Sequence, residues 1–332
     1  MKIKQLFGLA CVGLFLSMVA SPAWAQATRT WVSGVGDDAN PCSRTAPCKT
    51  FAGAISKTAA SGEIDVLDPG GFGALTITKA ITIANDGVGT AGVLVSGTNG
   101  FVVAAGPTDA VIIRGLDFIG LNPAASPGLN GIRVTQAGSV LIDHCKIINF
   151  SQNGIDFRPT NSGATLAVVD TVLSGNGSNG DPFLANYGDV LVQGNGGGTA
   201  AVNVTATFDR VQFLNAFAPG LRVDGGQSTG TATVSVRNSL AQNSGKSGFS
   251  AQTEAPANGV VTLTIDSSTA ANNVGFGVHS TGTNSTVYMS NSTVTGNGTG
   301  VAVSSSNLIS LKNNAIVGNT TNGAPTSTTA LQ

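Results

Sequence analysis

Charged side chains at outward strand positions are the residues whose types and spacing could do chemistry. They recur in successive apolar segments, each a few residues after a turn. If these segments stack in register, the charges form one mixed, partly basic stripe that suits an anionic polymer. Over about six segments the row extends roughly 25 to 30 Å. Because that is too dispersed for one catalytic centre, we expect ordinary solvated charges. The residues are Arg133, Asp156, Arg158, Arg222, Asp224 and His279.

Few residues of this chain could serve in imidazole or thiol chemistry. His144 and His279 are the only histidines, and no Cys/His cluster has the spacing of a zinc site. Cys145 shares the parity of Ile147, so we expect it to point inward as a small apolar residue. The sequence therefore favours neither a transition-metal site nor a Ser/His/Asp triad.

Hard oxygen ligands gather near the N-terminus, at Asp37, Asp38 and Asn40. Carboxylate and amide oxygens of this kind bind calcium, so the three are candidate calcium ligands. The same residue types stabilise turns by bonding to nearby backbone, and that interpretation is favoured. No other cofactor is predicted.

A long Gly- and Asn-rich interruption at residues 175–198 offers a candidate binding site. Loops on rigid solenoids commonly carry binding surfaces. Phe183 and Tyr187 in this loop could stack on a sugar ring. The alternative is that both rings fold back on the wall of the repeat.

One short sequence motif recurs seven times from residue 140 onward, and the strands that it forms would position these side chains. Alternating apolar residues lead to a polar residue, then an apolar pair, then an Asn. The closing asparagines recur every 22 to 29 residues, with one interval of 39, and this period indicates a solenoid. Asn tolerates left-handed backbone at a tight turn, so we expect a structural asparagine ladder. Its members are Asn149, Asn176, Asn215, Asn243, Asn272, Asn297 and Asn319.

A second row stands six residues before each ladder asparagine. Because stacked carboxylates would repel, we expect each member to bond turn amides or an occasional basic neighbour. The row is Asp143, Asp170, Asp209, Arg237, Asp266, Asn291 and Asn313.

The N-terminal end of the chain predicts export. Residues 1–25 combine Lys2 and Lys4, an apolar run and the sequence Ala23-Trp24-Ala25, which is the order of a cleaved secretory signal. The run is short for a membrane span, and no later stretch reaches 18 apolar residues. We therefore expect no membrane span and a location in the medium, at the cell surface or in the periplasm.

Charge argues against a nucleic-acid partner. Without residues 1–25 the chain has 16 − 2 = 14 basic and 17 acidic residues, a net charge of −3. Only 10% of residues are charged, and 45 are Gly, which fits many short strands with tight turns. We expect a monomer.

Residues 26–62 predict an N-terminal cap for the solenoid. A short strand at residues 30–34 precedes a loop in which Cys42 and Cys48 are expected to form a local disulfide after export. Residues 49–60 carry apolar side chains at helical spacing and end before Ser61 and Gly62. A helix there would cover the exposed end of the first coil.

The order of these motifs resembles the entrance cap of secreted bacterial right-handed parallel β-helix proteins, the pectin-lyase-like superfamily. The resemblance spans the cap at roughly residues 30–73 and the repeats beyond it. It implies an all-β chain: a strand-helix cap, then a right-handed parallel β-helix of about ten coils at residues 63–323, then a polar tail at residues 324–332.

The same resemblance says less about activity. Uronide lyases of the superfamily use an Arg or Lys base beside calcium-binding carboxylates, because removing a proton next to a carboxylate needs its charge neutralised. Its polygalacturonases carry paired Asp residues and a Gly-His-Gly in central coils. Here the only paired Asp is Asp37-Asp38 in the cap, and the nearest echo of the second motif is Gly277, Val278 and His279.

Three functions remain open. The leading hypothesis is an exported, non-enzymatic protein that binds polysaccharide or a cell-surface glycan through its long face and loops. The first alternative is a calcium-dependent polyuronate lyase that uses Arg133, Arg158 or Arg222 with Asp156 and Asp224. The second is a structural stalk.

Overall fold

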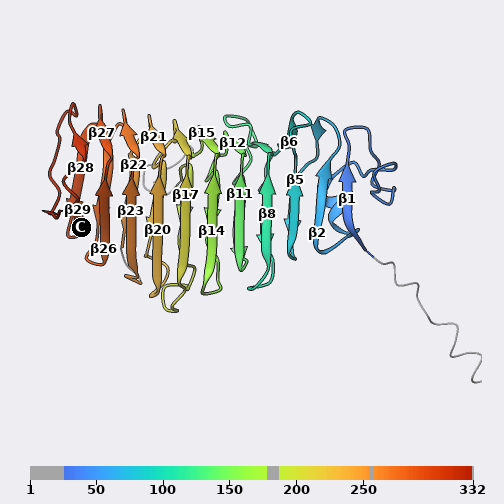
Figure 1. Cartoon of the computed structure of the whole chain (residues 1–332), viewed down its shortest axis with the longest axis horizontal. Helices are drawn as coiled ribbons and strands as arrows, with labels where there is room; N and C mark the ends of the chain where they lie inside the picture. Colours follow the sequence, from blue (N-terminus) through green and yellow to red (C-terminus); the bar gives the residue numbers. More distant parts are fainter. Residues whose placement is uncertain (1–25, 178–186, 254–256, 331–332) are drawn as a thin grey trace, which may run out of the picture.

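The repeats wind into a right-handed parallel β-helix, as the sequence predicts (Figure 1). This computed structural model describes residues 26–177, 187–253 and 257–330. The predicted signal at residues 1–25 lies outside the described residues. Each coil contributes one strand to sheet 1, then one to sheet 2, then one to sheet 3, and every pairing between coils in these sheets is parallel.

The three sheets hold twelve, ten and nine strands among the described residues. Sheet 1 comprises β1 (Ala27–Val32), β2 (Thr58–Val66), β5 (Ile81–Ala84), β8 (Ala110–Arg114), β11 (Ser139–Asp143), β14 (Ala164–Val169), β17 (Val204–Asp209), β20 (Thr231–Arg237), β23 (Val260–Asp266), β26 (Ser285–Ser290), β29 (Asn307–Ser310) and β31 (Ser327–Thr328). Sheet 2 comprises β3 (Gly70–Gly71), β6 (Ala91–Leu94), β9 (Asp117–Ile119), β12 (Lys146–Ile148), β15 (Val172–Ser174), β18 (Gln212–Leu214), β21 (Leu240–Gln242), β24 (Thr269–Ala271), β27 (Thr293–Thr295) and β30 (Ala315–Ile316). Sheet 3 comprises β4 (Leu75–Ile77), β7 (Phe101–Ala104), β10 (Ile132–Gln136), β13 (Ile155–Phe157), β16 (Val190–Val192), β19 (Leu221–Asp224), β22 (Ser247–Gln252), β25 (Phe276–Thr281) and β28 (Thr299–Ser304).

A continuous apolar core runs along the inside of the solenoid because alternate residues of each strand point inward. In sheet 1, for example, Val140 lies opposite Leu166, and both are buried. Several phenylalanine rings contact one another edge to face within this core, and burial of each side chain contributes about 2 to 3 kcal/mol. The fully buried ones are Phe51, Phe72, Phe101, Phe118, Phe150, Phe157, Phe208, Phe213 and Phe249.

The cap helix is shorter than the spacing predicts. Helix α2 (Phe51–Ile55) is capped by Thr50, whose side chain accepts a hydrogen bond from the Gly53 amide, and the chain then enters β2 at Thr58. The prediction of a helix to residue 60 was wrong because these residues pair with β1, with Thr58 opposite Ala27. A buried hydrogen bond of 2.7 Å joins the hydroxyls of Thr58 and Thr30.

The tail also belongs to the solenoid. Residues 327 and 328 form β31, which pairs with β29 and extends sheet 1 by one strand. Residues 324–332 were expected to be only a polar tail, but the free edge of β29 offers backbone groups that residues 326–329 satisfy.

The seven ladder asparagines occupy two adjacent positions at the corner after sheet 2, where one row was expected. Four have left-handed backbone and belong to the first position, where other coils have Gly: Asn149, Asn215, Asn243 and Asn272. The other three, Asn176, Asn297 and Asn319, follow a left-handed Gly and point into the corner. The sequence does not separate the rows, because Asn and Gly both accept a left-handed turn.

Buried amides form the continuous ladder at the second position. Asn273, which the repeat pattern did not select, donates through its side chain to Asn297 Oδ1 at 2.8 Å. Asn297 donates in the same way to Asn319 Oδ1 at 2.8 Å. Both asparagines are 1% exposed, so these bonds lie in the interior.

Candidate functional site

The candidate charges line up on the outer face of sheet 3. Pairing between coils places one column in the order Arg133, Asp156, Leu191, Arg222, Ser250 and His279. Asp224 stands two residues beyond Arg222 at the end of β19, and Arg158 directly follows β13. Both belong to the neighbouring column, where Asp224 lies opposite Gln252. We call Arg133, Asp156, Arg158, Arg222 and Asp224 the sheet 3 charge cluster.

The first half of this cluster is centred on a buried carboxylate. Asp156 is fully buried and accepts two hydrogen bonds from Arg158, at 2.7 and 2.8 Å, and Arg133 lies 3.5 Å away. Burial disfavours the charged form of Arg158, but the bonds and charge of Asp156 outweigh it and raise the pKa of Arg158 above its usual value. The side chains of Arg133 and Arg158 remain 37% and 31% exposed, so both can reach a ligand.

The second half is centred on Asp224. Arg222 donates to Asp224 Oδ2 at 2.5 and 3.1 Å, and Gln252 donates to the same oxygen at 3.2 Å. The Gly226 amide donates to Oδ1 at 2.6 Å. Arg222 and Asp224 are only 9% and 5% exposed, respectively.

Asp156, Arg222 and Asp224 are buried, whereas the sequence predicted ordinary solvated charges. Since β strands fix the Cα positions and charge-assisted bonds fix the side chains, the cluster is rigid. Both carboxylates are already bonded to arginine, so calcium would have to displace an arginine from each.

Aromatic side chains lie at the start of the sheet 3 strands. The rings of Phe276 and His279 stack with centroids 4.4 Å apart and an interplanar angle of 21°, and both are half-buried. Phe217 is 45% exposed, and Tyr187 is half-buried. Phe183 lies outside the described residues. The sequence analysis missed Phe217 and Phe276, although each follows a turn beside a predicted strand.

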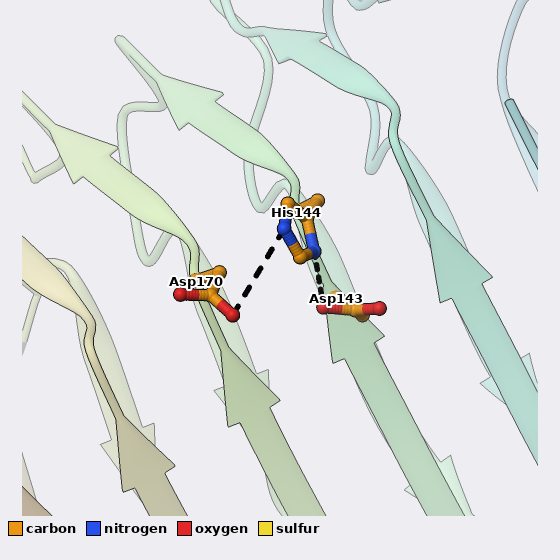
Figure 2. Close-up of side chains that lie close together, drawn as sticks. All are labelled: Asp143, His144 and Asp170. Atoms are coloured by element: carbon orange, nitrogen blue, oxygen red, sulfur yellow. Dashed lines mark hydrogen bonds and ion pairs between the residues drawn. The ribbon is translucent and has the colours of Figure 1, made fainter. Parts of the chain in front are cut away.

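A second polar cluster lies at the corner between sheets 1 and 2, where Asp143, His144 and Asp170 meet (Figure 2). His144 Nδ1 is 2.6 Å from Asp143, and Nε2 is 3.9 Å from Asp170 in the next coil. The expected row is out of register here, because Asp143 pairs with Val169 and Asp170 is one residue further on.

The donor atoms of this trio lie within 4.8 Å of one another, but their partners do not suit a metal ion. Arg210 donates to both oxygens of Asp170, at 2.6 and 2.8 Å, and these bonds lower the pKa of Asp170. Arg210 and Arg237 both bond to Asp209 in turn. The trio therefore adjoins a chain of ion pairs, from Asp170 through Arg210 and Asp209 to Arg237, that links successive coils.

The cap candidates for calcium are engaged in turns. Asp38 accepts from the Thr50 hydroxyl at 2.7 Å and from two backbone amides, which holds the start of α2. Asp37 accepts from the Ala39 amide, and Asn40 donates to the Pro47 carbonyl. The structure has a disulfide between Cys42 and Cys48, which closes the same loop.

The fold and these repeats define a class: the chain belongs to the family of right-handed β-helix regions, whose model matches residues 80–321. Among solved structures, a rhamnogalacturonan lyase is similar with a TM-score of 0.56 and 13% identity, over 78% of this chain and 74% of that one. Pectate lyase Pel9A is similar with a TM-score of 0.49 and 16% identity, over 92% and 80%. No curated protein sequence matches the chain significantly. At these identities the similarity concerns the fold alone.

None of the helices in the described residues is long and apolar enough to cross a membrane.

Proposed function

We propose that this protein is an exported, non-enzymatic module that binds an acidic polysaccharide along the outer face of sheet 3. The observation that carries the proposal is the sheet 3 charge cluster, in which three arginines stand against two aspartates in adjacent columns. The partly exposed guanidinium groups of Arg133 and Arg158 are suited to carboxylates, which they can bind with paired N–H donors.

The aromatic side chains support a sugar as the repeating unit. The stacked rings of Phe276 and His279 lie two coils beyond Arg222 on the same sheet. Sugar rings have apolar C–H faces that pack on aromatic rings, while their carboxylates and hydroxyls meet the charged column.

The pairing of the charges favours binding over lyase chemistry. An arginine that removes a proton must give up its own, and Asp156 holds Arg158 in the charged form. Calcium, which would neutralise the substrate carboxylate, finds no free oxygen pair on Asp156 or Asp224.

Export is part of the same proposal. The charge and apolar pattern of residues 1–25 supports it, and so does the disulfide between Cys42 and Cys48, since such bonds persist in oxidising compartments.

Co-sedimentation with insoluble polygalacturonate tests the binding proposal. The full chain should be retained, and the double variant Arg133→Gln Arg158→Gln should be retained at least about tenfold less tightly, because two charge-assisted contacts are lost. Arg237→Gln, which removes an exposed guanidinium from sheet 1, is the matched control and should bind as the wild type does.

The same incubations, with calcium and with chelator, are followed by ultraviolet absorbance for an unsaturated product. A calcium-dependent rise would replace this proposal by the lyase hypothesis. Absence of both retention and absorbance change would leave a stalk.

A further inference from the structure

A pocket of about 330 Å³ lies between the cap and the first coils, away from sheet 3. Its walls come from β1 and β2 of sheet 1, from the disulfide loop and from the segment after β5. Binding sites for small ligands begin at about this size and combine apolar walls with a few polar groups. This pocket has both kinds of wall.

The apolar wall is built around Trp31, with Leu67 and Val88 beside it. The Arg29 guanidinium lies 5.7 Å from the centroid of the Trp31 ring and bonds to Asp65. The bond to Asp65 holds the Arg29 guanidinium over the indole, where it makes a cation–π contact.

A cation without a partner stands at the rim. Arg44 lines the pocket and is exposed, and within the described part of the chain it has no hydrogen bond or ion pair. It lies in a tight turn in which the Ala46 amide donates to the Ser43 carbonyl at 3.1 Å. The disulfide between Cys42 and Cys48 closes this turn, so a ligand gains the charge at little cost in loop ordering.

An acceptor completes the set. Asp86 lines the pocket, and its side chain is 62% exposed. Arg114 donates to Oδ1 of Asp86 at 2.9 Å, and among the described residues Oδ2 has no donor. A carboxylate oxygen in this state accepts hydrogen bonds from hydroxyl groups.

We infer that this pocket binds an anionic monosaccharide unit, one whose ring carries a carboxylate or a sulfate. The anion pairs with Arg44, ring hydroxyls donate to Asp86, and the C–H face of the ring packs on Trp31 and Val88. The site does not depend on the function proposed for sheet 3, because the two faces share no residue.

Tryptophan fluorescence measures binding directly at this pocket. Trp24 and Trp31 are the only tryptophans, so Trp24→Phe in the full chain leaves Trp31 as the sole reporter. Glucuronate, glucose 6-sulfate and glucose share one ring and differ in the charge at C6. We expect a saturable change with an anionic sugar and none with glucose over the same concentrations; the stronger of the two anions identifies the natural group.

Variants at the rim supply the matched comparison. Arg44→Gln should weaken anionic-sugar binding at least about tenfold, the loss of one charge-assisted contact, while Arg44→Lys should retain part of it. Arg237→Gln removes the same group elsewhere on sheet 1 and should bind like the parent chain.

Three results would overturn the inference: no saturable response to either anion, an equal response to glucose, or an unchanged affinity in Arg44→Gln. The double variant Arg133→Gln Arg158→Gln should leave the Trp31 response intact. Failure of polysaccharide retention and failure of this pocket are therefore separate outcomes.

Discussion

Asparagines at the two adjacent positions of the corner after sheet 2 contribute very differently to the stability of the fold. Asn297 is buried in the corner ladder, where its Oδ1 accepts from the Asn273 amide and side chain at 2.9 and 2.8 Å. Asn272 is exposed and serves the left-handed turn. Environment decides the energy of each, because an unpaired polar group costs most where water is absent.

Asn297→Ala should lower the free energy of unfolding by about 2 to 3 kcal/mol, since buried partners on both neighbouring coils are left unsatisfied. Asn272→Gly should change it by less than about 0.5 kcal/mol, because Gly adopts the same left-handed backbone. Urea unfolding followed by circular dichroism measures both. Equal losses in the two variants would contradict the distinction between the rows.

Asp189 stands where the adjacent coils have Gly154 and Gly220. It is fully buried, its Oδ1 accepts from Asn176 at 2.7 Å, and its Oδ2 has no hydrogen-bond partner among the residues that the structure describes. Burial raises the pKa of Asp189 well above its ordinary value. Its stabilising contribution is therefore complete at low pH, where the carboxyl is protonated in both states, and is lost as pH rises toward the raised pKa.

Relative to the wild type, Asp189→Asn should gain stability as pH rises from about 4 to 7, with a slope of at most about 1.4 kcal/mol per pH unit for one proton. Asp266→Asn is the control. Hydrogen bonds from Ser290, Asn291 and Ser267 lower the pKa of Asp266, so its stabilising contribution is complete above about pH 4 and is lost only as pH falls further. Relative to the wild type, this variant should therefore keep nearly constant stability from about pH 4 to 7. Urea titrations at three pH values test both, and parallel pH profiles would refute the assignment for Asp189.

Elements act on their neighbours along the solenoid, and the cap helix shows how. Phe51 of α2 is fully buried, with its ring centroid 5.2 Å from that of Phe72 and 5.6 Å from that of Phe101. In a stack of coils each unit contacts only the next, so damage to the cap is felt first at that end.

Phe51→Ala should cost about 3 to 5 kcal/mol locally and raise amide exchange in β1, β2 and β4, leaving β20 and β23 protected. Phe213→Ala, in a middle coil, is the counterpart and should raise exchange around β18. Hydrogen exchange read by mass spectrometry resolves these segments. Uniform loss of protection in both variants would mean that the coils unfold as one unit.

The whole molecule is a one-dimensional stack, visible as the ordered row of sheet 1 strands along the long axis in Figure 1. Its stability is then the sum of coil terms and interface terms. The ion pairs from Asp170 to Arg237 and the amide hydrogen bonds from Asn273 to Asn319 run along this axis and join successive coils.

Deletion of residues 305–332 removes β29, β30 and β31 only. The shortened chain should stay folded, with a smaller urea m-value because less surface becomes exposed on unfolding. Circular dichroism should keep its strand signal. Complete loss of that signal would show that the C-terminal coils are needed to hold the rest.

The repeat period and the alternation of apolar residues by themselves determined a solenoid, because a two-residue alternation that returns every 22 to 29 residues, with one interval of 39, can bury its apolar face only by stacking coils. The right-handed parallel β-helix was what the resemblance of the cap and the repeats implied. Selection of the outward charges at Arg133, Asp156 and Arg222 came from the same parity, and pairing places them on one face of sheet 3.

Only the tertiary structure decided the register and the environment. Because either Asn or Gly can occupy the left-handed position of the turn, two rows of asparagines were predicted as one. The cap helix was predicted to extend over residues that instead pair with β1. Burial of Asp156 and its bonds to Arg158, and the pocket around Trp31, arise from segments brought together by folding. Local pattern fixes which side of a strand a residue faces, whereas the contacts that set its charge and energy come from other coils.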